Sequence, residues 1–374
     1  MQHSLFTTKS YDISLHPITY IHVWSGRRLN MGLDIVRKHT GTLCIVDETR
    51  ISPNIVNEIL KSRIEDVPKI LEKYSDNIAC KYELKTDFIP TLHSAILELN
   101  PYIVPGSSLK GYIRTAILFE FLNEIKDKNK LIKVLRSGIN TSADPRNVSQ
   151  GLEAGFFRAP KPKRQKGFVD SFQTLLVSDP ILSIESKCYN LSELLVYKLQ
   201  QSKSLQYIAS QYAVTVSCGK LRYRIDLIAP SKDMISMISK VDEEHKAIVD
   251  RLRLLLEKNL VIALKNFGCY LLSKELERVK GIGELSQYAR LLAELEERYC
   301  KIESRCILAR IGYMAGLHSK TVIGIVKTVD QQLYEEVRRL MEAQLHHSWD
   351  EFTIKLVKTP QGFVGPGWCE ICLS

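Results

Sequence analysis

The segment at residues 105–126 constrains the fold more than any other part of this sequence. Its Pro-Gly-Ser-Ser start is typical of a turn that opens a helix, and apolar residues then recur at every fourth position. These residues are Leu109, Ile113, Ile117 and Phe121. The spacing predicts a helix over 107–126 that buries one apolar face.

The start of this helix carries groups that suit an anion. Lys110 and Arg114 lie one turn apart, and Gly106, Ser107 and Ser108 form the turn before them. Free backbone N–H groups at a helix start favour negative charge, and two cations on one helical face can hold a phosphate. We therefore expect both cations to face outward and to bind an RNA backbone. The alternative is that they are ordinary solvated side chains.

The N-terminal region has the composition of a sheet. Residues 11–24 nearly alternate between apolar and polar types and are rich in β-formers, which predicts a strand. A loop with Ser25, Arg27 and Arg28 is expected to follow, and residues 41–47 predict a second strand.

The next apolar run has helical spacing. It covers residues 53–75, and Pro68 is expected to divide it into two helices that pack on the first sheet. A strand, two helices and further strands suit a ferredoxin-like domain.

Residues 136–170 interrupt this periodicity with many glycines, prolines and polar side chains, so we expect a long loop. Its basic stretch includes Arg158, Lys161, Lys163 and Arg164. Flexible basic segments flanked by aromatic residues can follow phosphates and stack on unpaired bases. A solvated linker between domains is an equally good interpretation.

The chain then returns to strands and long helices. Residues 172–179 predict a strand that ends at Asp-Pro. Residues 205–229 predict two strands joined across Cys218-Gly-Lys as a hairpin. Residues 231–305 predict amphipathic helices that are interrupted at 281–283.

A second glycine-bearing turn follows the predicted strand at 306–311. The turn and the residues after it offer open backbone donors, a hydroxyl and a cation, and we expect four of them to lie near RNA. They are Gly312, Gly316, Ser319 and Lys320. The lysine stands four places after the second glycine, so the spacing of a nucleotide-binding P-loop is absent. A helix at 330–347 and a strand at 352–357 are expected to follow.

The exact residue sequence of the first motif is more specific than its charge and helix-start geometry. Residues 105–115 match the Pro-Gly-Ser-Ser-(Leu/Ile)-Lys-Gly-x-(Leu/Ile)-Arg-Thr signature of RAMP proteins, the RNA-binding subunits of CRISPR effector complexes, and the chain resembles that superfamily. Further similar segments lie at 18–26, 177–179, 312–321 and 367–368. Their order and the chain length resemble the family of the fifth Csm subunit of type III-A systems.

This resemblance implies an α+β fold with two ferredoxin-like (RRM-like) RAMP domains and helical insertions. We place the first domain at 1–170, including a basic loop at 136–170. The second domain is placed at 171–374, with a helical insertion at about 231–305.

The resemblance also implies that the loop after residue 22 approaches the guide RNA. The usual His-Ile-Gly-Ser-Gly of the family appears here with Trp24 in place of its first glycine. Trp24 offers an aromatic face for stacking, although we expect a core position for it. Met314 similarly replaces a glycine of the second glycine-rich loop.

Composition agrees with a polyanionic partner. The 374 residues include 52 Lys and Arg against 42 Asp and Glu, a net charge of +10, and 45% of them are apolar. This length favours two domains and this apolar content favours packed cores. We see neither a signal peptide nor a membrane span, so we expect a cytoplasmic protein.

The cysteines do not form a complete metal motif. Nine are scattered along the chain, and in a cytoplasmic protein we expect reduced, mostly buried thiols. Cys369 and Cys372 have the spacing of half a zinc ribbon, but a second half is missing. We therefore expect a terminal strand with buried thiols, no metal and no cofactor.

The sequence shows no recognisable catalytic constellation. His318, His346 and His347 stand without an obvious paired carboxylate, and isolated histidines are more often structural. The main hypothesis is a noncatalytic subunit that binds the CRISPR RNA (crRNA) near its 3′ end, caps one end of the Csm filament and supports crRNA maturation and antiviral defence. The alternative is a stand-alone RAMP endoribonuclease that processes CRISPR transcripts. The implied partners are crRNA and other Csm subunits, with target RNA and host nucleases as further candidates and no membrane.

Overall fold

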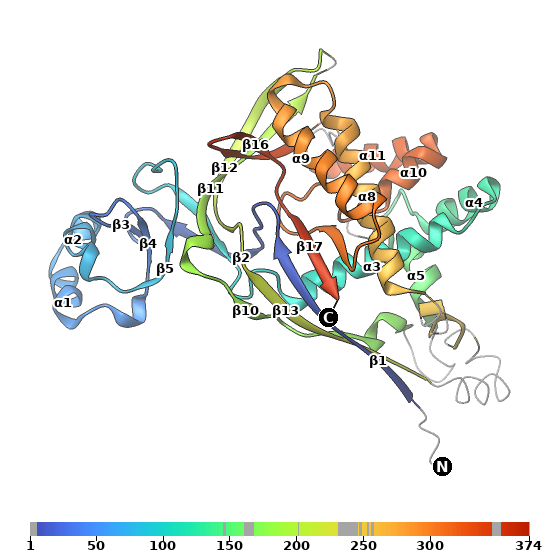
Figure 1. The fold of residues 1–374 in the computed structure, drawn as a ribbon, viewed down its shortest axis with the longest axis horizontal. Helices are drawn as coiled ribbons and strands as arrows, with labels where there is room; N and C mark the ends of the chain where they lie inside the picture. The colour runs from blue at the N-terminus through green and yellow to red at the C-terminus, as the bar shows by residue number, and fades with distance from the viewer. Residues whose placement is uncertain are drawn as a thin grey trace.

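The computed structural model combines two large sheets, a smaller lobe and a layer of helices (Figure 1). It describes residues 6–144, 147–160, 168–200, 202–230, 246, 249–252, 254–255, 258–345 and 353–373. The mixture of helices and sheets confirms the predicted α+β class. No helix within these ranges is long and apolar enough to cross a membrane.

The first sheet is built around the N-terminal strand. Strand β1 (Phe6–Pro17) pairs antiparallel with β13 (Lys220–Pro230) on one side and with β17 (Trp368–Leu373) on the other. β14 (Cys306–Arg310) extends the sheet beyond β17, while β10 (Ile181–Ser183) and β9 (Leu175–Val177) pair with β13. The first and the last strand of the described residues therefore pair in one sheet.

The second sheet has the order β16-β15-β11-β12-β6-β2. Its strands are β2 (Trp24–Asn30), β6 (Ala95–Leu99), β11 (Tyr189–Leu199), β12 (Leu205–Val216), β15 (Thr353–Thr359) and β16 (Gly362–Val364). Its pairs are antiparallel except that β12 runs parallel to β6.

The small lobe at the left of Figure 1 has its own sheet and core. Strands β3 (Ile35–Arg37), β4 (Leu43–Val46) and β5 (Cys80–Leu84) carry helices α1 (Pro53–Lys61) and α2 (Val67–Lys73). Two helices near Pro68 are confirmed, with this proline in the first turn of α2. The helices pack on the three-stranded sheet, not on the sheet that contains β1 as predicted, because their apolar partners come from β3 and β4.

The predicted motif helix is α3 (Gly106–Asn123), and its four predicted apolar residues are all buried. It packs against α8 (Leu260–Val279), where Phe267 lies 5.4 Å from Tyr112 and 5.3 Å from Phe119 between ring centroids. α8 also packs closely on β14, since a Cβ atom at Gly268 would lie 2.0 Å from the Leu308 carbonyl oxygen. Helices α3 and α8 therefore pack against each other, and each also contacts the first sheet, α3 at β9 and α8 at β14.

The remaining helices agree broadly with the predicted periodicity. They are α4 (Lys128–Gly138), α5 (Gln150–Phe157), α9 (Ser286–Glu296), α10 (Ile323–Val329) and α11 (Gln331–Leu345). The expected interruption at 281–283 separates α8 from α9, and the strands expected at 306–311 and 352–357 correspond to β14 and β15.

Several local predictions were wrong. The strand predicted at 11–24 ends at Pro17, and Ser25, Arg27 and Arg28 lie in strand β2 instead of a loop. The supposed long loop at 136–170 contains α5 and the paired strands β7 (Arg158–Pro160) and β8 (Phe168–Asp170).

The hairpin predicted at 205–229 is also wrong. Both strands exist, but β12 and β13 belong to different sheets. The turn between them includes Gly219, whose positive φ of 106° takes the chain from one sheet to the other. The residues at 218–220 predicted the turn correctly, but they did not predict which strands β12 and β13 pair with.

The cysteines also differ from the prediction of reduced thiols. Eight of the nine form the pairs Cys44–Cys80, Cys188–Cys218, Cys269–Cys300 and Cys306–Cys372. Cys369 is free and buried. The partners are 30 to 66 residues apart in sequence, so the spacing of the cysteines gave no indication of these pairs.

Both large sheets take strands from each side of residue 170. One hydrophobic cluster runs from Ile13 to Ile371 and includes side chains from α3, α8 and β14. The two halves of the sequence thus share a core, and the division into domains at 170 stays a prediction.

Candidate nucleic-acid interface

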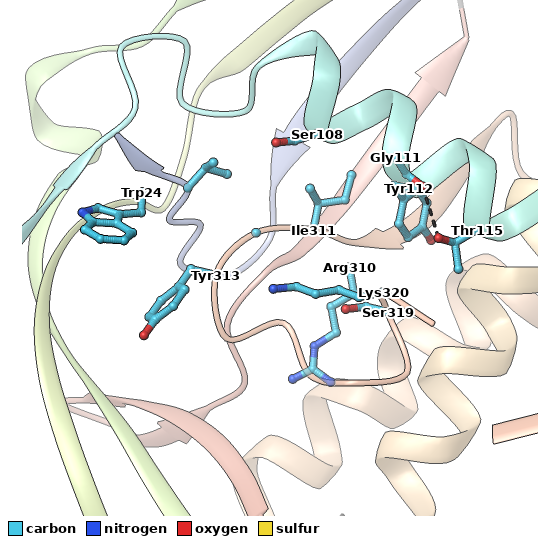
Figure 2. Close-up of a pocket in the computed structure, with 12 residues that line it drawn as sticks. Trp24, Ser108, Gly111, Tyr112, Thr115, Arg310, Ile311, Tyr313, Ser319 and Lys320 are labelled. Carbon is cyan, nitrogen blue, oxygen red and sulfur yellow. Dashed lines mark hydrogen bonds between the residues drawn. The ribbon is translucent and has the colours of Figure 1, made fainter. Parts of the chain in front are cut away.

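Three segments that are far apart in sequence surround one pocket of about 370 Å³ (Figure 2). They are the start of β2, the first turns of α3 and the loop that follows β14. The pocket is lined by Val23, Trp24, Ser108, Gly111, Tyr112, Thr115, Arg310, Ile311, Gly312, Tyr313, Ser319 and Lys320. Parts of three of the four predicted RNA-binding segments therefore meet at one place, and the basic stretch that includes Arg158 is not among them.

The segment before β2 is fixed by backbone contacts with the second sheet and with the glycine loop. The Ile21 N–H donates to the Val216 carbonyl at 2.8 Å, and an imidazole nitrogen of His22, Nδ1, lies 2.7 Å from the Val214 carbonyl oxygen. The Tyr313 N–H in turn donates to the His22 carbonyl at 2.6 Å. Burial lowers the pKa of His22 to about 4, so this imidazole is neutral at physiological pH.

Gly312 makes this junction possible. Its φ is +114°, and a Cβ atom there would lie 2.6 Å from the His22 carbonyl oxygen. The glycine therefore allows close approach of two protein segments, which is a different role from the predicted approach to RNA. Gly316 also has a positive φ, +92°, and Met314 adopts +59° at the position where a glycine was expected.

A buried ion pair forms the wall behind the glycine loop. The guanidinium of Arg310 donates to Glu275 at 3.0 Å and lies 5.0 Å from the centre of the Trp368 ring. Burial alone would raise the pKa of Glu275, but Arg310 and Arg278 beside it lower the pKa to about 2. The carboxylate and guanidinium are both charged and neutralise each other. Arg310 therefore stabilises the wall of the pocket and does not offer a free charge to a ligand.

Trp24 and Tyr313 stand at the edge of the pocket with exposed rings. The side chain of Trp24 is 43% exposed and that of Tyr313 is 36% exposed. The indole N–H of Trp24 donates to the Arg27 carbonyl at 2.7 Å, which fixes the orientation of the ring. The core position expected for Trp24 is wrong, because the strand that begins at this residue faces the opening.

Ser319 and Lys320 close the other side of the pocket. Ser319 is buried, and its hydroxyl donates to the Gly316 carbonyl at 2.9 Å, so it shapes the loop. Lys320 reaches solvent, and partial desolvation lowers the pKa of its ammonium group. Within the described part of the chain Lys320 has no ion pair with a carboxylate, which leaves its charge for a ligand.

The start of α3 is occupied by another part of this chain. The Gly106 N–H donates to the carboxylate of Asp179 at 2.8 Å, and a Cβ atom at Gly106 would lie 2.4 Å from the Ser178 carbonyl oxygen. Two segments of the RAMP resemblance, 105–115 and 177–179, therefore bind each other. The anion expected at this helix start is at least partly supplied by Asp179.

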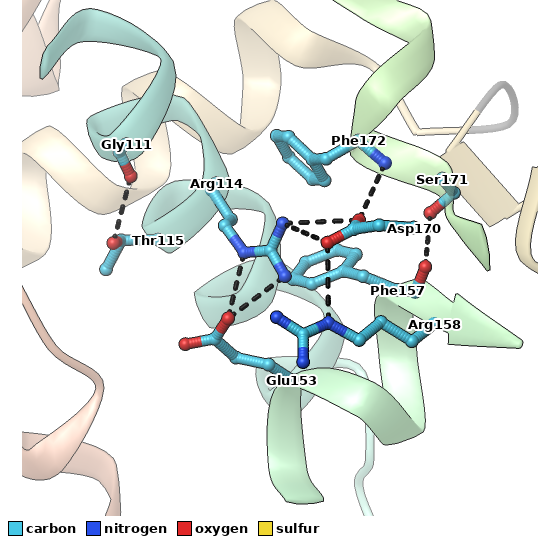
Figure 3. Close-up of polar contacts among 9 residues, drawn as sticks. All are labelled: Gly111, Arg114, Thr115, Glu153, Phe157, Arg158, Asp170, Ser171 and Phe172. Carbon is cyan, nitrogen blue, oxygen red and sulfur yellow. Dashed lines mark hydrogen bonds and ion pairs between the residues drawn. The ribbon is translucent and has the colours of Figure 1, made fainter. Parts of the chain in front are cut away.

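Arg114 is also engaged within the protein (Figure 3). Its guanidinium donates to Glu153 at 3.0 Å and to Asp170 at 3.1 Å, and it lies over the rings of Phe157 and Phe172 at 4.7 and 5.1 Å. The expectation that it faces outward is wrong. Two carboxylates neutralise it, so we leave it out of the proposed interface.

Asp170 binds a second predicted cation. The guanidinium Nε of Arg158 lies 3.5 Å from its carboxylate. Lys110 is partly buried near Asp170 and Arg114, and desolvation is the main cause of its lowered pKa. Neither residue lines the pocket.

The other predicted residues vary in exposure. Ser25 donates to Glu98 at 2.7 Å, while Arg27 is 57% exposed and makes long ion pairs of 3.7 and 3.9 Å with Glu48 and Glu98. Arg28 and Ser107 are exposed. Lys161, Lys163 and Arg164 lie outside the described residues, as do His346 and His347.

Comparison with known proteins gives one curated relative and two informative structures. The CRISPR system protein Csm5 of Methanocaldococcus jannaschii is 24% identical over 248 residues, which cover 64% of this chain and 51% of that protein. The crystal structure of T. onnurineus Csm5 aligns with a TM-score of 0.54 at 18% identity, covering 95% of this chain and 99% of the other. The chain resembles Csm5 in sequence and in fold.

A second structure supports the same fold. One chain of a cryo-EM Csm–crRNA–target RNA ternary complex from a type III-A CRISPR-Cas system aligns with a TM-score of 0.62 at 18% identity, covering 98% of this chain and all of that chain. No family model matches the sequence. The chain spans about half the length of the curated Csm5 that it matches. The resemblance predicted from the motifs is thus confirmed for the fold, while individual contacts with RNA are untested.

Sequence reasoning missed Tyr313 and Thr115 as lining residues. Tyr313 stands directly after Gly312, and its aromatic type within a glycine loop was an available signal. Thr115 is the last residue of the first motif, and the sequence gives no separate signal for it. In the structure its hydroxyl donates to the Gly111 carbonyl at 3.2 Å within α3.

Proposed function

We propose that this chain is a Csm5-type RAMP subunit of a type III-A Csm effector complex, acting in the cytoplasm. It binds crRNA near the 3′ end, caps one end of the filament and supports crRNA maturation and antiviral defence without cutting RNA itself. Its partners are crRNA, target RNA paired with it, and the neighbouring Csm subunits. The finer architecture that we propose is a pair of modified ferredoxin-like halves, one around each large sheet.

One observation carries this proposal. The pocket joins the loop before β2, the RAMP signature helix and the glycine loop after β14, which come from the beginning, the end of the first third and the last fifth of the chain. Lys320 and the exposed rings of Trp24 and Tyr313 meet there. This combination of a cation with aromatic faces suits single-stranded nucleic acid, which binds through phosphates and stacked bases.

The chemistry of the pocket supports binding more than cleavage. The described lining contains the basic groups of Arg310 and Lys320 together with hydroxyls, and includes no imidazole or carboxylate. His22 lies beneath it but is 1% exposed, which keeps its imidazole from reaching a substrate. Metal-independent RNA cleavage needs a positioned general base and acid, so the endoribonuclease hypothesis ranks second.

The capping role is tested by assembling the Csm complex with and without this chain. We expect the complex that lacks it to keep its other subunits and to hold crRNAs with longer, less trimmed 3′ ends. Native mass spectrometry should count one copy in the complete complex, while sequencing gives the RNA ends. Several copies per complex, or unchanged 3′ ends, would contradict the end cap.

The noncatalytic role needs a separate experiment. Purified protein should leave repeat RNA and crRNA intact, with or without divalent metal. Cleavage that disappears in His318→Ala, and persists in the surface control Lys69→Ala, would support the endoribonuclease instead.

A further inference from the structure

The edge of the pocket presents two aromatic faces that the fold itself leaves uncovered. Most of the large aromatic side chains in the core are fully buried, such as Trp368, Tyr288 and Phe267. Trp24 and Tyr313 differ, with exposed fractions of 43% and 36% at one opening. Each exposes an apolar ring that a ligand can cover.

Both rings are held in place before any ligand binds. The indole N–H of Trp24 donates to the Arg27 carbonyl at 2.7 Å. Tyr313 is fixed through its backbone N–H on the His22 carbonyl, and the His22 ring meets the Tyr313 ring edge to face at 5.8 Å between centroids. Preorganised rings lose little conformational entropy when they bind, so they are suited to recognition.

Lys320 supplies a charge in the same pocket as these rings. Figure 2 shows Trp24 and Tyr313 on one side of the opening, with Lys320 extending from the glycine loop toward the same space. Ser108 reaches the opening from α3. Aromatic faces beside a cation match the two parts of a nucleotide, its base and its phosphate.

We propose that Trp24 and Tyr313 form a stacking site for one unpaired base of the bound RNA, and that Lys320 binds the adjoining phosphate. This inference rests on the proposed function and adds a specific subsite to it. Stacking accepts every base because each base has an aromatic face, so the site selects unpaired RNA without selecting a sequence.

The site makes two contributions that experiment can separate. Stacking on Trp24 is not ionic, so its removal should weaken binding without changing the dependence on salt. The contact of Lys320 with phosphate is ionic, so its removal should reduce the slope of log K against log salt by about one. These different signatures distinguish a base contact from a phosphate contact.

The test measures binding of the full chain to a fluorescein-labelled, unstructured 12-nucleotide RNA by anisotropy at several salt concentrations. We expect Trp24→Ala to weaken binding by roughly 5- to 100-fold with an unchanged slope, following the cost of losing one stacked base. Trp24→Phe should retain most of the affinity. Trp24→Leu, which keeps apolar bulk without an aromatic face, should resemble Trp24→Ala.

A set of RNAs that each lack one base gives the complementary measurement. One abasic position should weaken binding to the wild type and have little further effect on Trp24→Ala. Thermal unfolding checks that each variant is folded, and the Phe and Leu pair keeps the test valid if alanine destabilises the protein.

The outcomes separate the two levels of the proposal. Equal affinities of the Phe, Leu and Ala variants and the wild type, together with weaker binding by Lys320→Ala, would overturn the stacking site and leave the RNA-binding function standing. A wild-type protein that fails to bind the RNA, alone and within the Csm complex, would overturn the proposed function itself.

Discussion

Two basic residues near helix α3, Arg114 and Lys320, have opposite electrostatic surroundings. Arg114 lies between Glu153 and Asp170, and its side chain is 21% exposed. Lys320 lies across the neighbouring pocket, reaches solvent and has no carboxylate partner within the described ranges. The motif residue with the more specific sequence signal is therefore structural, while the less obvious lysine keeps its charge for a ligand.

This difference shows why a cation in a nucleic-acid motif is not yet a nucleic-acid contact. The phosphate-binding role needs a charge that the fold leaves unneutralised. Carboxylates from a distant segment decide this, and their position depends on the tertiary structure. The expected effect of replacing each basic residue follows from whether a carboxylate already neutralises its charge.

The largest expected effect comes from the buried pair behind the pocket. Arg310→Met should lower the free energy of unfolding by about 3–5 kcal/mol, because it removes the buried partner of Glu275 and leaves that buried carboxylate with Arg278 alone. The double variant Arg310→Met with Glu275→Gln should recover part of this loss. Denaturant unfolding measures both, and a single variant as stable as the wild type would show that the wall of the pocket does not depend on this pair.

Acid should weaken the junction beneath the pocket. The pKa of His22 falls from 6.5 to about 4 on burial, so folding is favoured by its neutral form. Its contribution is complete above pH 6.5 and is lost as the pH falls toward 4, at about 1.4 kcal/mol per pH unit. The lowered pKa of Glu275 adds a loss only below its ordinary value of 4.5.

The variant His22→Asn separates the pH range in which His22 affects stability from the lower range in which Glu275 does. An Asn amide can still donate to the Val214 carbonyl but does not titrate. We expect its stability to change less than that of the wild type between pH 6.5 and 4.5 in denaturant unfolding. Parallel pH profiles for the two proteins would contradict the assignment to His22.

Arg114 should have a smaller effect on stability and little effect on RNA. Arg114→Ala should lower the free energy of unfolding by about 2–3 kcal/mol, since Asp170 and Glu153 lose a partly buried partner. Arg114→Lys should recover little, because lysine lacks the planar fork that binds both carboxylates. Folded Arg114→Ala with strongly reduced RNA affinity would break the comparison, since it would place this cation in the interface after all.

Local patterns in the sequence predicted several elements correctly, although they missed the end of β1 at Pro17 and helix α5 within 136–170. The buried face of α3, the helices on either side of Pro68 and the interruption at 281–283 all follow from spacing within one segment. The motif segments also gave the pocket, because Ser108, Gly312 and Lys320 meet in it.

Contacts between distant segments were not predictable in this way. β12 and β13 are adjacent in sequence and lie in different sheets, and Arg114 meets Asp170 across 56 residues. Trp24 is of a residue type common in cores, yet it is exposed where the pairing of β2 with β6 shifts register between Trp24 and Arg28. Such features arise from how elements pack, for which a single sequence carries no direct signal.

The smallest expected effect distinguishes two lysines of equal charge. Lys320→Ala should weaken RNA binding several-fold and reduce the salt slope by about one, because it removes an unneutralised cation from the pocket. Lys110→Ala should change affinity less, since Lys110 lies outside the pocket lining and near the carboxylate of Asp170. Both variants should keep the stability of the wild type within about 0.5 kcal/mol, because neither ammonium group forms an ion pair within the described residues. Anisotropy titrations of the two variants under identical salt conditions make the comparison direct. A larger loss for Lys110 than for Lys320 would move the RNA path from the pocket to the outer face of α3.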